Sequence, residues 1–306
     1  MKWTTLLLVI TARLLLGQSA ISLINTPLSD VRVAWQPPAS MMKISMQLTN
    51  GMAFVKAEAA GKSGFFLLDT GAPILVVNQK PGAENSVSAT SFSNSFVANH
   101  LNINDFKWNL IHEKSLEAIA VDLSHMEASS GLPLCGIIGF DVLKNFELLL
   151  DYEGKQLILL SPRKKELQKT AKPLLAIPFE LQEHLPVVQV KIDGQSLRFG
   201  LDTGAGVNLI DQKWLDILSP EALELGDTEG VRGIDQELKL VKSAAIKNTK
   251  IASTDLGTMK FLFTDLSYLQ SSTPLRIDGL LGYNFFQKVK CSINYEEKML
   301  YIWDVE

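Results

Sequence analysis

The sequence predicts an all-β protein of two similar lobes related by a pseudo-two-fold axis, with one short helix in each lobe. First, one segment occurs twice, and GKSGFFLLDTGAPILVVNQK at 61–80 shares ten of twenty positions with GQSLRFGLDTGAGVNLIDQK at 194–213 without a gap. Second, apolar residues alternate, as at Val188, Val190 and Ile192, which is the two-residue period of a strand. Third, hairpin pairs such as Asp-Gly separate the apolar runs.

A second repeated block completes each lobe. GIIGFDVLKNFELLLDYEGKQLILL at 136–160 pairs with GLLGYNFFQKVKCSINYEEKMLYIW at 279–303. The first match has an offset of 133 residues and the second an offset of 143, so the second copy holds about ten extra residues between its blocks. The expected helices follow the Gly pairs, over 140–146 and 283–289.

The N-terminus predicts an exported protein. Residues 1–20 carry an early Lys, an apolar stretch and small residues before a cleavage point, which is typical of a signal peptide. Arg13 leaves too few uninterrupted apolar residues for the alternative, an uncleaved membrane anchor. We expect a periplasmic, outer-surface or secreted location, with no stable membrane insertion after signal cleavage.

The remaining chain divides into an N-terminal segment at 21–41, a first lobe at 42–160, a linker at 161–174 and a second lobe at 175–306. The linker, SPRKKELQKTAKPL, is polar and charged, and its basic residues form a short run typical of a solvated linker. A net charge of −4 provides no basic field for phosphates, so we expect no nucleic-acid partner.

The repeated LDTGA pentapeptide is the candidate for chemistry. A single Asp-Thr-Gly is typical of an ordinary turn. Two copies in register differ, because a pseudo-two-fold axis brings equivalent loops together, and Asp69 and Asp202 would then face each other. Two carboxylates about 3 Å apart cannot both ionise, so the pair would share one proton. The ionised member would activate water while the protonated member polarises a carbonyl group.

With these motifs the sequence resembles the retropepsin-like aspartic proteases, and among them the bacterial exported aspartyl proteases with two fused lobes. The resemblance covers 42–160 and 175–306, and its carriers are Asp69-Thr70-Gly71-Ala72, Asp202-Thr203-Gly204-Ala205, Gly136-Ile137-Ile138-Gly139 and Gly279-Leu280-Leu281-Gly282.

The resemblance implies two acid-protease β-barrel lobes, cleavage of peptide or protein substrates, and neither cofactor nor metal. It implies that Asp69 and Asp202 are catalytic, and that the residues supporting their loops are Thr70, Gly71, Ala72, Thr203, Gly204 and Ala205. The two threonines would tie the loops together through mutual hydrogen bonds. The structural glycines, which let a strand pass closely behind each loop, would be Gly136, Gly139, Gly279 and Gly282.

Some positions depart from the family pattern. An Asp often precedes the Gly pair, and the second lobe has Asp278 there, whereas the first has Cys135. The family covers its substrate with a hairpin flap from each lobe. The second-lobe candidate at 229–235 contains glycines, whereas the first-lobe candidate at 86–95 has none. Because Ala72 and its counterpart in the second loop carry no hydroxyl to lower the pKa of the aspartates, a less acidic pH optimum is expected.

Two other functions stay open. The same fold would serve as a non-catalytic peptide-binding module, which the loss of either Asp would favour. A two-carboxylate glycosidase would line its site with aromatic side chains, for which Trp108, Trp214 and Trp303 are candidates.

The remaining chemistry-bearing residue types carry no motif. The four histidines, His100, His112, His125 and His184, show no metal-ligand or Cys-His spacing and are expected at the surface or as satisfied residues. We expect Cys135 and Cys291 to be free thiols.

Overall fold

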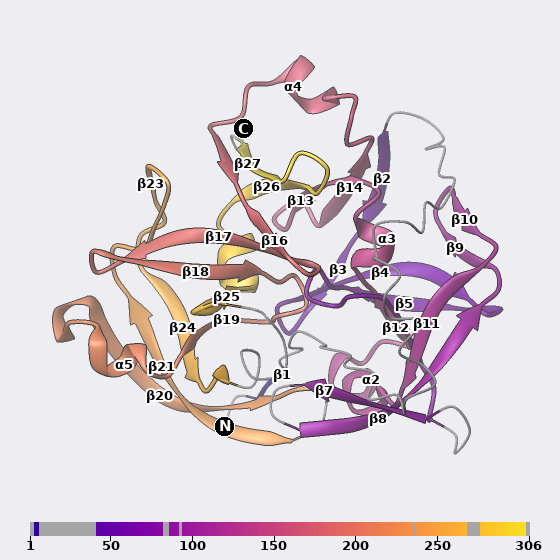
Figure 1. Cartoon of the computed structure of the whole chain (residues 1–306), viewed down its shortest axis with the longest axis horizontal. Helices are drawn as coiled ribbons and strands as arrows, with labels where there is room; N and C mark the ends of the chain where they lie inside the picture. The colour runs from indigo at the N-terminus through magenta and orange to yellow at the C-terminus, as the bar shows by residue number, and fades with distance from the viewer. Residues whose placement is uncertain are drawn as a thin grey trace.

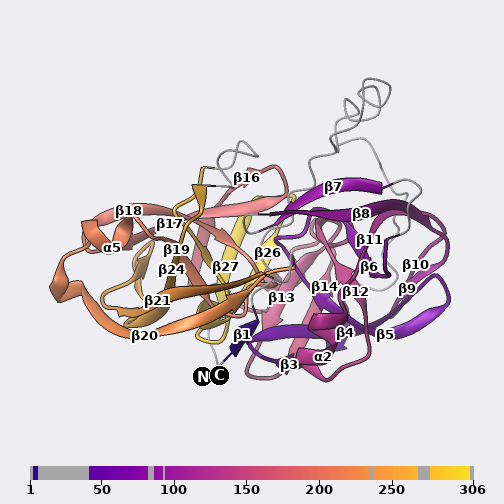
Figure 2. The ribbon, with the colours of Figure 1, turned by 90° about the horizontal axis from the view of Figure 1, so that it is seen from below.

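The computed structural model describes residues 3–5, 41–81, 86–91, 94–234, 237–267 and 276–303. The chain is mostly β, as expected, and forms three sheets with short helices between them. Figures 1 and 2 show two curled, barrel-like bodies side by side, the first half of the chain in purple and the second in orange. We call residues 42–160 the first half and residues 175–306 the second half.

A ten-stranded sheet contains the strands between residues 47 and 138. Its order is β10-β9-β4-β5-β12-β6-β11-β8-β7, with β3 paired to β4. The strands are β3 Gln47–Thr49, β4 Met52–Ala59, β5 Lys62–Leu68, β6 Leu75–Asn78, β7 Ser86–Ser91, β8 Asn94–Ile103, β9 Phe106–Trp108, β10 Ile111–Glu113, β11 Leu116–Val121 and β12 Leu134–Ile138.

An eleven-stranded sheet contains most strands of the second half. Its order is β1-β20-β21-β24-β19-β25-β18-β17-β22-β23, with β16 paired to β17. The strands are β1 Trp3–Thr5, β16 Glu180–Gln182, β17 Leu185–Ile192, β18 Gln195–Leu201, β19 Asn208–Asp211, β20 Leu223–Arg232, β21 Leu238–Ile246, β22 Lys250–Ile251, β23 Thr254–Asp255, β24 Met259–Thr264 and β25 Gly279–Leu281.

The same strand arrangement recurs at the centre of both sheets. In the first half, β12 runs parallel to β5 and antiparallel to β6. In the second half, β25 runs parallel to β18 and antiparallel to β19. Each Gly pair therefore lies beside the strand that ends in an Asp, which places the repeated motifs next to each other in space.

A six-stranded sheet combines both halves, in the order β15-β27-β26-β13-β14-β2. The join is the antiparallel pair β13–β26, in which Glu147 is opposite Asn294. Figure 1 shows this sheet at the top, between the two curled bodies. The strands are β2 Met41–Ser45, β13 Glu147–Asp151, β14 Gln156–Leu160, β15 Leu175–Pro178, β26 Lys290–Asn294 and β27 Met299–Trp303.

The helices are short. The two expected ones form directly after the Gly pairs, as α3 Phe140–Leu143 and α7 Tyr283–Phe286, and both end earlier than the sequence indicates. Further helical turns occur, one of them in the linker; they are α2 Ser124–Ser130, α4 Glu166–Thr170, α5 Trp214–Ile217 and the 3-10 turn η1 Pro220–Ala222. Among the described residues, no helix has the length and apolar character needed to span a bilayer.

Several expectations fall partly outside the described residues. The predicted signal peptide and N-terminal segment lie outside them, except for β1, which pairs in parallel with residues 230–232 of β20, and Met41 at the start of β2. The flap candidates form parts of the hairpins β7–β8 and β20–β21. The flap positions 92–93 and 235 are outside the described residues.

The apolar core continues from one half into the other. One cluster of buried side chains includes Trp108 of the first half, Leu150 of the shared sheet and Phe285 of the second half. Cys291 is buried in this cluster, and both Cys135 and Cys291 are free thiols. The two repeated loops thus belong to halves that share one apolar core.

Candidate active site

Each repeated Asp lies where an apolar strand leaves its sheet. Asp69 follows β5 and its backbone N–H donates to the Ile138 carbonyl of β12 at 3.1 Å. Asp202 follows β18 and donates to the Leu281 carbonyl of β25 at 3.0 Å. The flanking strand residues are buried, so both side chains are 1% exposed or less. The predicted loops therefore place two carboxyl groups in the buried interior.

The two carboxyl groups face each other across the boundary between the halves. A β-carbon added at Gly71 would lie 2.8 Å from the Asp202 carboxyl carbon, and one at Gly204 would lie 2.4 Å from that of Asp69. Oδ1 of each Asp accepts the N–H of the glycine two residues later, at 2.8 Å for Asp69 and 2.9 Å for Asp202. Only glycines leave room for this arrangement.

The remaining oxygens of the pair define its chemistry. Oδ2 of Asp69 and Oδ2 of Asp202 are buried, and neither has an N–H or O–H donor among the described residues. The two carboxyl groups lie close enough for the charge on one to disfavour ionisation of the other. Such an arrangement favours a pair that holds one proton between its two members.

The surroundings raise the pKa of both aspartates. Burial raises the pKa of Asp69 to about 6, an effect that the neighbouring Asp202 carboxyl group and the backbone of Gly71 and Ala72 oppose. Burial and the nearby charge of Asp69 raise the pKa of Asp202 well above its usual range. The two carboxyl groups therefore titrate as a unit.

Thr70 and Thr203 join the loops in the reciprocal way that the family resemblance implies. The hydroxyl of Thr70 donates to the Leu201 carbonyl at 2.7 Å and accepts the Thr203 N–H at 3.0 Å. The hydroxyl of Thr203 donates to the Leu68 carbonyl at 2.8 Å and accepts the Thr70 N–H at 3.0 Å. These four buried bonds hold the two loops in register.

The Gly pairs let β12 and β25 pass directly behind the loops. A β-carbon at Gly136 would lie 2.0 Å from the Val76 carbonyl oxygen, and one at Gly279 would lie 2.3 Å from that of Leu209. The second glycine of each pair is equally tight, since added β-carbons would lie 2.5 Å from the Ile74 oxygen at Gly139 and 2.4 Å from the Ala205 oxygen at Gly282. A side chain at any of these four positions would displace backbone next to an aspartate.

The departure from the family pattern before the first Gly pair has a structural counterpart. Asp278 accepts the backbone N–H of Arg198 at 3.0 Å and the indole N–H of Trp214 at 3.1 Å, and it pairs with Lys213. Cys135 occupies the matching place and lies against Gly64, where an added β-carbon would be 2.5 Å from its sulfur. The first half thus replaces a polar anchor with close packing.

Sequence reasoning missed three kinds of residue around the pair. His184, expected at the surface or with its ring hydrogen-bonded, is 3% exposed. Its Nε2 lies 2.8 Å from the Gly71 carbonyl oxygen. Its only sequence signal is its position in the repeat, where it corresponds to Gly51.

Asp141 and Asn284 occupy matching positions after the Gly pairs and support the loops. Asn284 accepts the Asn208 N–H at 3.1 Å, and Asp141 accepts the N–H of the corresponding Leu75. Burial raises the pKa of Asp141 to about 7. The repeat pairs these positions in the sequence, and only the fold shows what they contact.

Tyr152 and Tyr295 are the third missed group. Burial raises the pKa of both hydroxyls, and the charges of the two aspartates contribute to the shift. Tyr152 stacks on Phe286 of the second half at 5.7 Å, and Tyr295 meets Phe140 of the first half edge-on at 5.2 Å. Both hydroxyls are buried without a hydrogen-bond partner among the described side chains and backbone.

The candidates for other chemistry lie elsewhere. Trp108 and Trp303 are buried in apolar clusters, and Trp214 is bonded to Asp278, so these side chains form no aromatic platform at the pair. In the part of the chain that the structure describes, no group of three or more His, Cys, Asp or Glu side chains is arranged to hold a metal ion.

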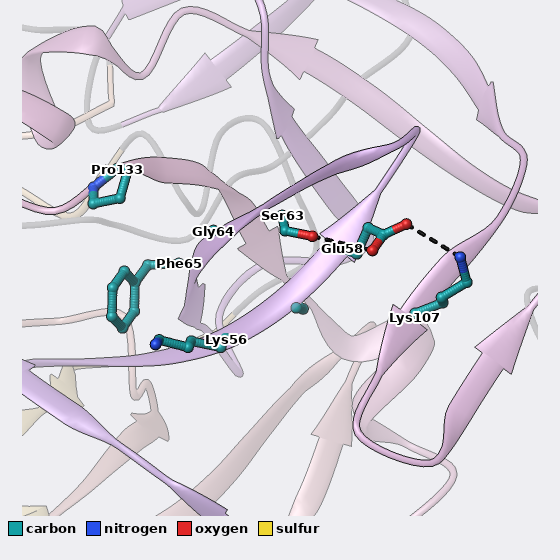
Figure 3. A pocket seen from close by; sticks show the side chains of 8 residues that line it. Lys56, Glu58, Ser63, Gly64, Phe65, Lys107 and Pro133 are labelled. Carbon is teal, nitrogen blue, oxygen red and sulfur yellow. Dashed lines mark hydrogen bonds and ion pairs between the residues drawn. The ribbon is translucent and has the colours of Figure 1, made fainter.

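An open pocket occurs on the first-half sheet, away from the aspartates. Figure 3 shows Lys107 bonded to Glu58, and Glu58 bonded to Ser63, on one side of the pocket, with Phe65 and Lys56 on the other. Neither Asp69 nor Asp202 lines this pocket. Lys107 and Glu58 form an ion pair in it, Lys56 lies over the Phe65 ring, and the pocket takes no part in the chemistry considered below.

The comparisons with known proteins agree with the geometry around the second loop. Residues 188–285 match the family model described as aspartyl protease, over about a third of the chain. The matched segment contains Asp202, the loop that follows it, and the Gly pair at 279 and 282. Asp69 lies outside it. No curated protein matched the chain.

Proposed function

We propose that the protein is an aspartic endopeptidase that hydrolyses peptide bonds with a water molecule activated between Asp69 and Asp202. The observation that carries this proposal is the pair itself: two buried carboxyl groups, on equivalent loops of the two halves, so close that the charge on one disfavours ionisation of the other. The aspartyl protease match around Asp202 supports the same class of chemistry.

The proposed reaction uses both protonation states at once. The ionised carboxylate accepts a proton from water as the water oxygen bonds to the peptide carbonyl carbon, and the protonated carboxyl group gives its proton to the carbonyl oxygen. The resulting tetrahedral intermediate breaks its C–N bond while the nitrogen takes a proton from the carboxyl group that received one, and a hydroxyl group of the intermediate returns its proton to the other carboxylate. An amine and a carboxylic acid leave, and the pair again holds one proton.

The organisation of the site is part of the proposal. We infer that residues 42–160 and 175–306 are two duplicated retropepsin-like lobes, each of which contributes one aspartate and the loop that supports it. We also infer a bacterial protein that is exported through the signal peptide at 1–20. N-terminal sequencing of the mature chain from fractionated cells tests the export, because an N-terminus at Met1 in the cytosol would exclude it.

Cleavage of a peptide library by the parent protein and by Asp69→Asn and Asp202→Asn variants tests the activity. Each variant should lose at least about 100-fold in rate, because neither half of the acid–base pair works alone. Asp216→Asn is the matched control, since Asp216 is exposed and away from the pair. If the parent binds peptides and cuts none, the alternative of a peptide-binding module with the same fold replaces the proposal. If either Asn variant cleaves at the parental rate, the shared mechanism fails.

A further inference from the structure

His184 reaches the first catalytic loop from the opposite half. The hairpin β16–β17 turns at Glu183 and His184, and its tip places Nε2 2.8 Å from the Gly71 carbonyl oxygen. The imidazole is 3% exposed. A carbonyl oxygen only accepts hydrogen bonds, so the ring carries its hydrogen on Nε2 and donates it. The contact therefore joins a second-half side chain to the loop that holds Asp69.

Gly71 contacts His184 and Asp69 at once. Its carbonyl oxygen accepts the His184 hydrogen bond, and its own N–H donates to Asp69 Oδ1 at 2.8 Å, where it favours the ionised form. The bond from His184 fixes the orientation of Gly71 and so holds this N–H on the carboxylate, because a site residue is most effective when a neighbouring side chain locks its position. Negative charge on Asp69 is thus stabilised by His184 through Gly71.

The second loop lacks this arrangement at the matching hairpin tip. Gly51, between β3 and β4, corresponds to His184 in the repeat, and it has no side chain. Its φ is +78°, and an added β-carbon would lie 2.4 Å from the Gly206 carbonyl oxygen. The tip therefore packs backbone against backbone, and no imidazole reaches the Asp202 loop from this position.

We propose that His184 is a positioning residue that makes the two aspartates unequal: its hydrogen bond to Gly71 stabilises charge on Asp69, so that the shared proton resides on Asp202. The inference rests on the proposed function and assigns its roles, with Asp69 as the base toward water and Asp202 as the acid toward the carbonyl oxygen.

The charge states of the groups around the pair fit a neutral donor at His184. Burial raises the pKa of both aspartates. Burial lowers the pKa of His184 to about 4, so the ring is a neutral donor over the range in which Asp69 ionises. Among the other titratable groups near the pair, Tyr152 and Tyr295 have raised pKa values and stay protonated in this range. Asp141, which lies beside the first loop, has its pKa raised to about 7 and titrates close to this range, so an Asp141→Asn variant identifies its signal.

Carboxyl ¹³C NMR titration of the whole protein, labelled at aspartate, tests the inference without relying on activity. His184→Phe removes the donor and keeps a planar ring, although the phenyl ring is somewhat larger than the imidazole, and His184→Gln retains an N–H at similar reach. Asp69→Asn and Asp202→Asn identify the signals of the pair. The lower of the two macroscopic pKa values should rise by at least about half a pH unit in the His184→Phe variant. In the His184→Gln variant this pKa should return most of the way to its value in the parent protein.

Kinetics supply the second readout. A rise of half a pH unit lowers kcat/KM about threefold on the acid side of the optimum and leaves the plateau unchanged, whereas a purely structural loss would lower the profile evenly. His100→Phe is the control, because His100 lies on β8 and is half-exposed.

The outcomes separate the inference from the proposed function. An unshifted titration in folded His184→Phe overturns the inference even if the parent cleaves peptides. A shifted titration in a parent that cleaves nothing upholds the unequal pair and removes its catalytic role. Should the Phe variant not fold, ¹⁵N NMR of His184 in the parent decides, because an Nδ1–H tautomer or a charged ring at pH 6 contradicts the hydrogen bond.

Discussion

The backbone N–H of Thr70 lies 3.0 Å from the hydroxyl oxygen of Thr203, and the reciprocal pair has the same separation. Each hydroxyl also donates to a carbonyl at the end of the opposite strand. The two loops are therefore joined by side chains that serve as donor and acceptor at once, and neither loop is complete without the other.

The Thr203 hydroxyl should contribute measurably to stability. Thr203→Val keeps the shape of the side chain and removes the hydroxyl, which leaves the Thr70 N–H and the Leu68 carbonyl buried without partners. The free energy of unfolding should fall by about 2–4 kcal/mol, the usual cost of two such groups. Urea denaturation measures it, with Thr203→Ser as the control that retains the hydroxyl. A Val variant as stable as the parent would show that these bonds contribute nothing.

Cleavage should be most efficient well above the pH range of free aspartic acid. The acid limb of kcat/KM should lie near pH 6, because burial raises the pKa of Asp69 to about that value, and the alkaline limb should follow the higher pKa of Asp202. The bell-shaped pH–rate profile with a fluorogenic peptide checks this. Both limbs below about pH 4 would contradict it, since an unperturbed Asp titrates near 3.9.

Asp69→Asn should stabilise the protein at neutral pH while abolishing activity. In the unfolded chain Asp69 ionises near pH 4, whereas the folded protein keeps this proton until about pH 6. Ionisation of Asp69 therefore favours the unfolded chain. The resulting loss of stability is fully present at pH values above the pKa of Asp69 in the folded protein. The variant should exceed the parent by up to about 3 kcal/mol at pH 8 and by nothing near pH 3. Denaturation at both pH values measures the difference, and Asp216→Asn should show none.

Gly279→Ala should disturb the second loop from behind. The added methyl group would lie 2.3 Å from the Leu209 carbonyl oxygen and equally close to the Phe199 ring. Overpacking of this kind costs roughly 3 kcal/mol, and it should also lower activity because the Asp202 loop rests on β25. Gly194→Ala is the comparison, since its methyl group meets open space and only its φ of +75° costs about 1 kcal/mol. Equal losses in the two variants would argue against the close approach.

Glu147 should link the two halves through the shared sheet. Its carboxylate is buried and accepts the Ser292 hydroxyl at 2.6 Å and the Asn294 amide at 3.3 Å. Glu147→Ala removes the acceptor of the buried Ser292 hydroxyl and one of the two acceptors of the Asn294 amide, which keeps its bond to the Pro162 carbonyl. The variant should cost about 1–3 kcal/mol in the free energy of unfolding. Glu147→Gln retains the hydrogen-bonding capacity and should cost less than half as much. Thermal and urea unfolding of both variants provide the measurement.

The sequence was informative where both the local pattern and the repeat agreed. The end of an apolar run, an Asp and a Gly identified the loops of Asp69 and Asp202, because that order needs a turn whose small residues admit a close neighbour. The repeat then supplied the expectation that the loops meet. It also indicated where the helices after the Gly pairs begin, although both end within one turn.

The sheet partners and the cross-half contacts could not be predicted in the same way. Alternation identifies a strand and gives no partner for it, so β13 and β26 show no sign in the sequence that they pair with each other. His184 sits in a two-residue hairpin turn, where a polar residue is ordinarily solvated. Its burial follows from where that hairpin reaches in three dimensions, which depends on the packing of both halves.

The shared sheet also determines how the molecule can be divided. β13 has β14 of its own half on one side and β26 of the other half on its second side. A cut in the linker at 161–174 would therefore yield two fragments, each with an uncovered strand edge that invites aggregation. Reassembly of the separated fragments would depend on their concentration, whereas the intact polypeptide supplies each edge with its complement at a fixed one-to-one ratio and at high effective concentration.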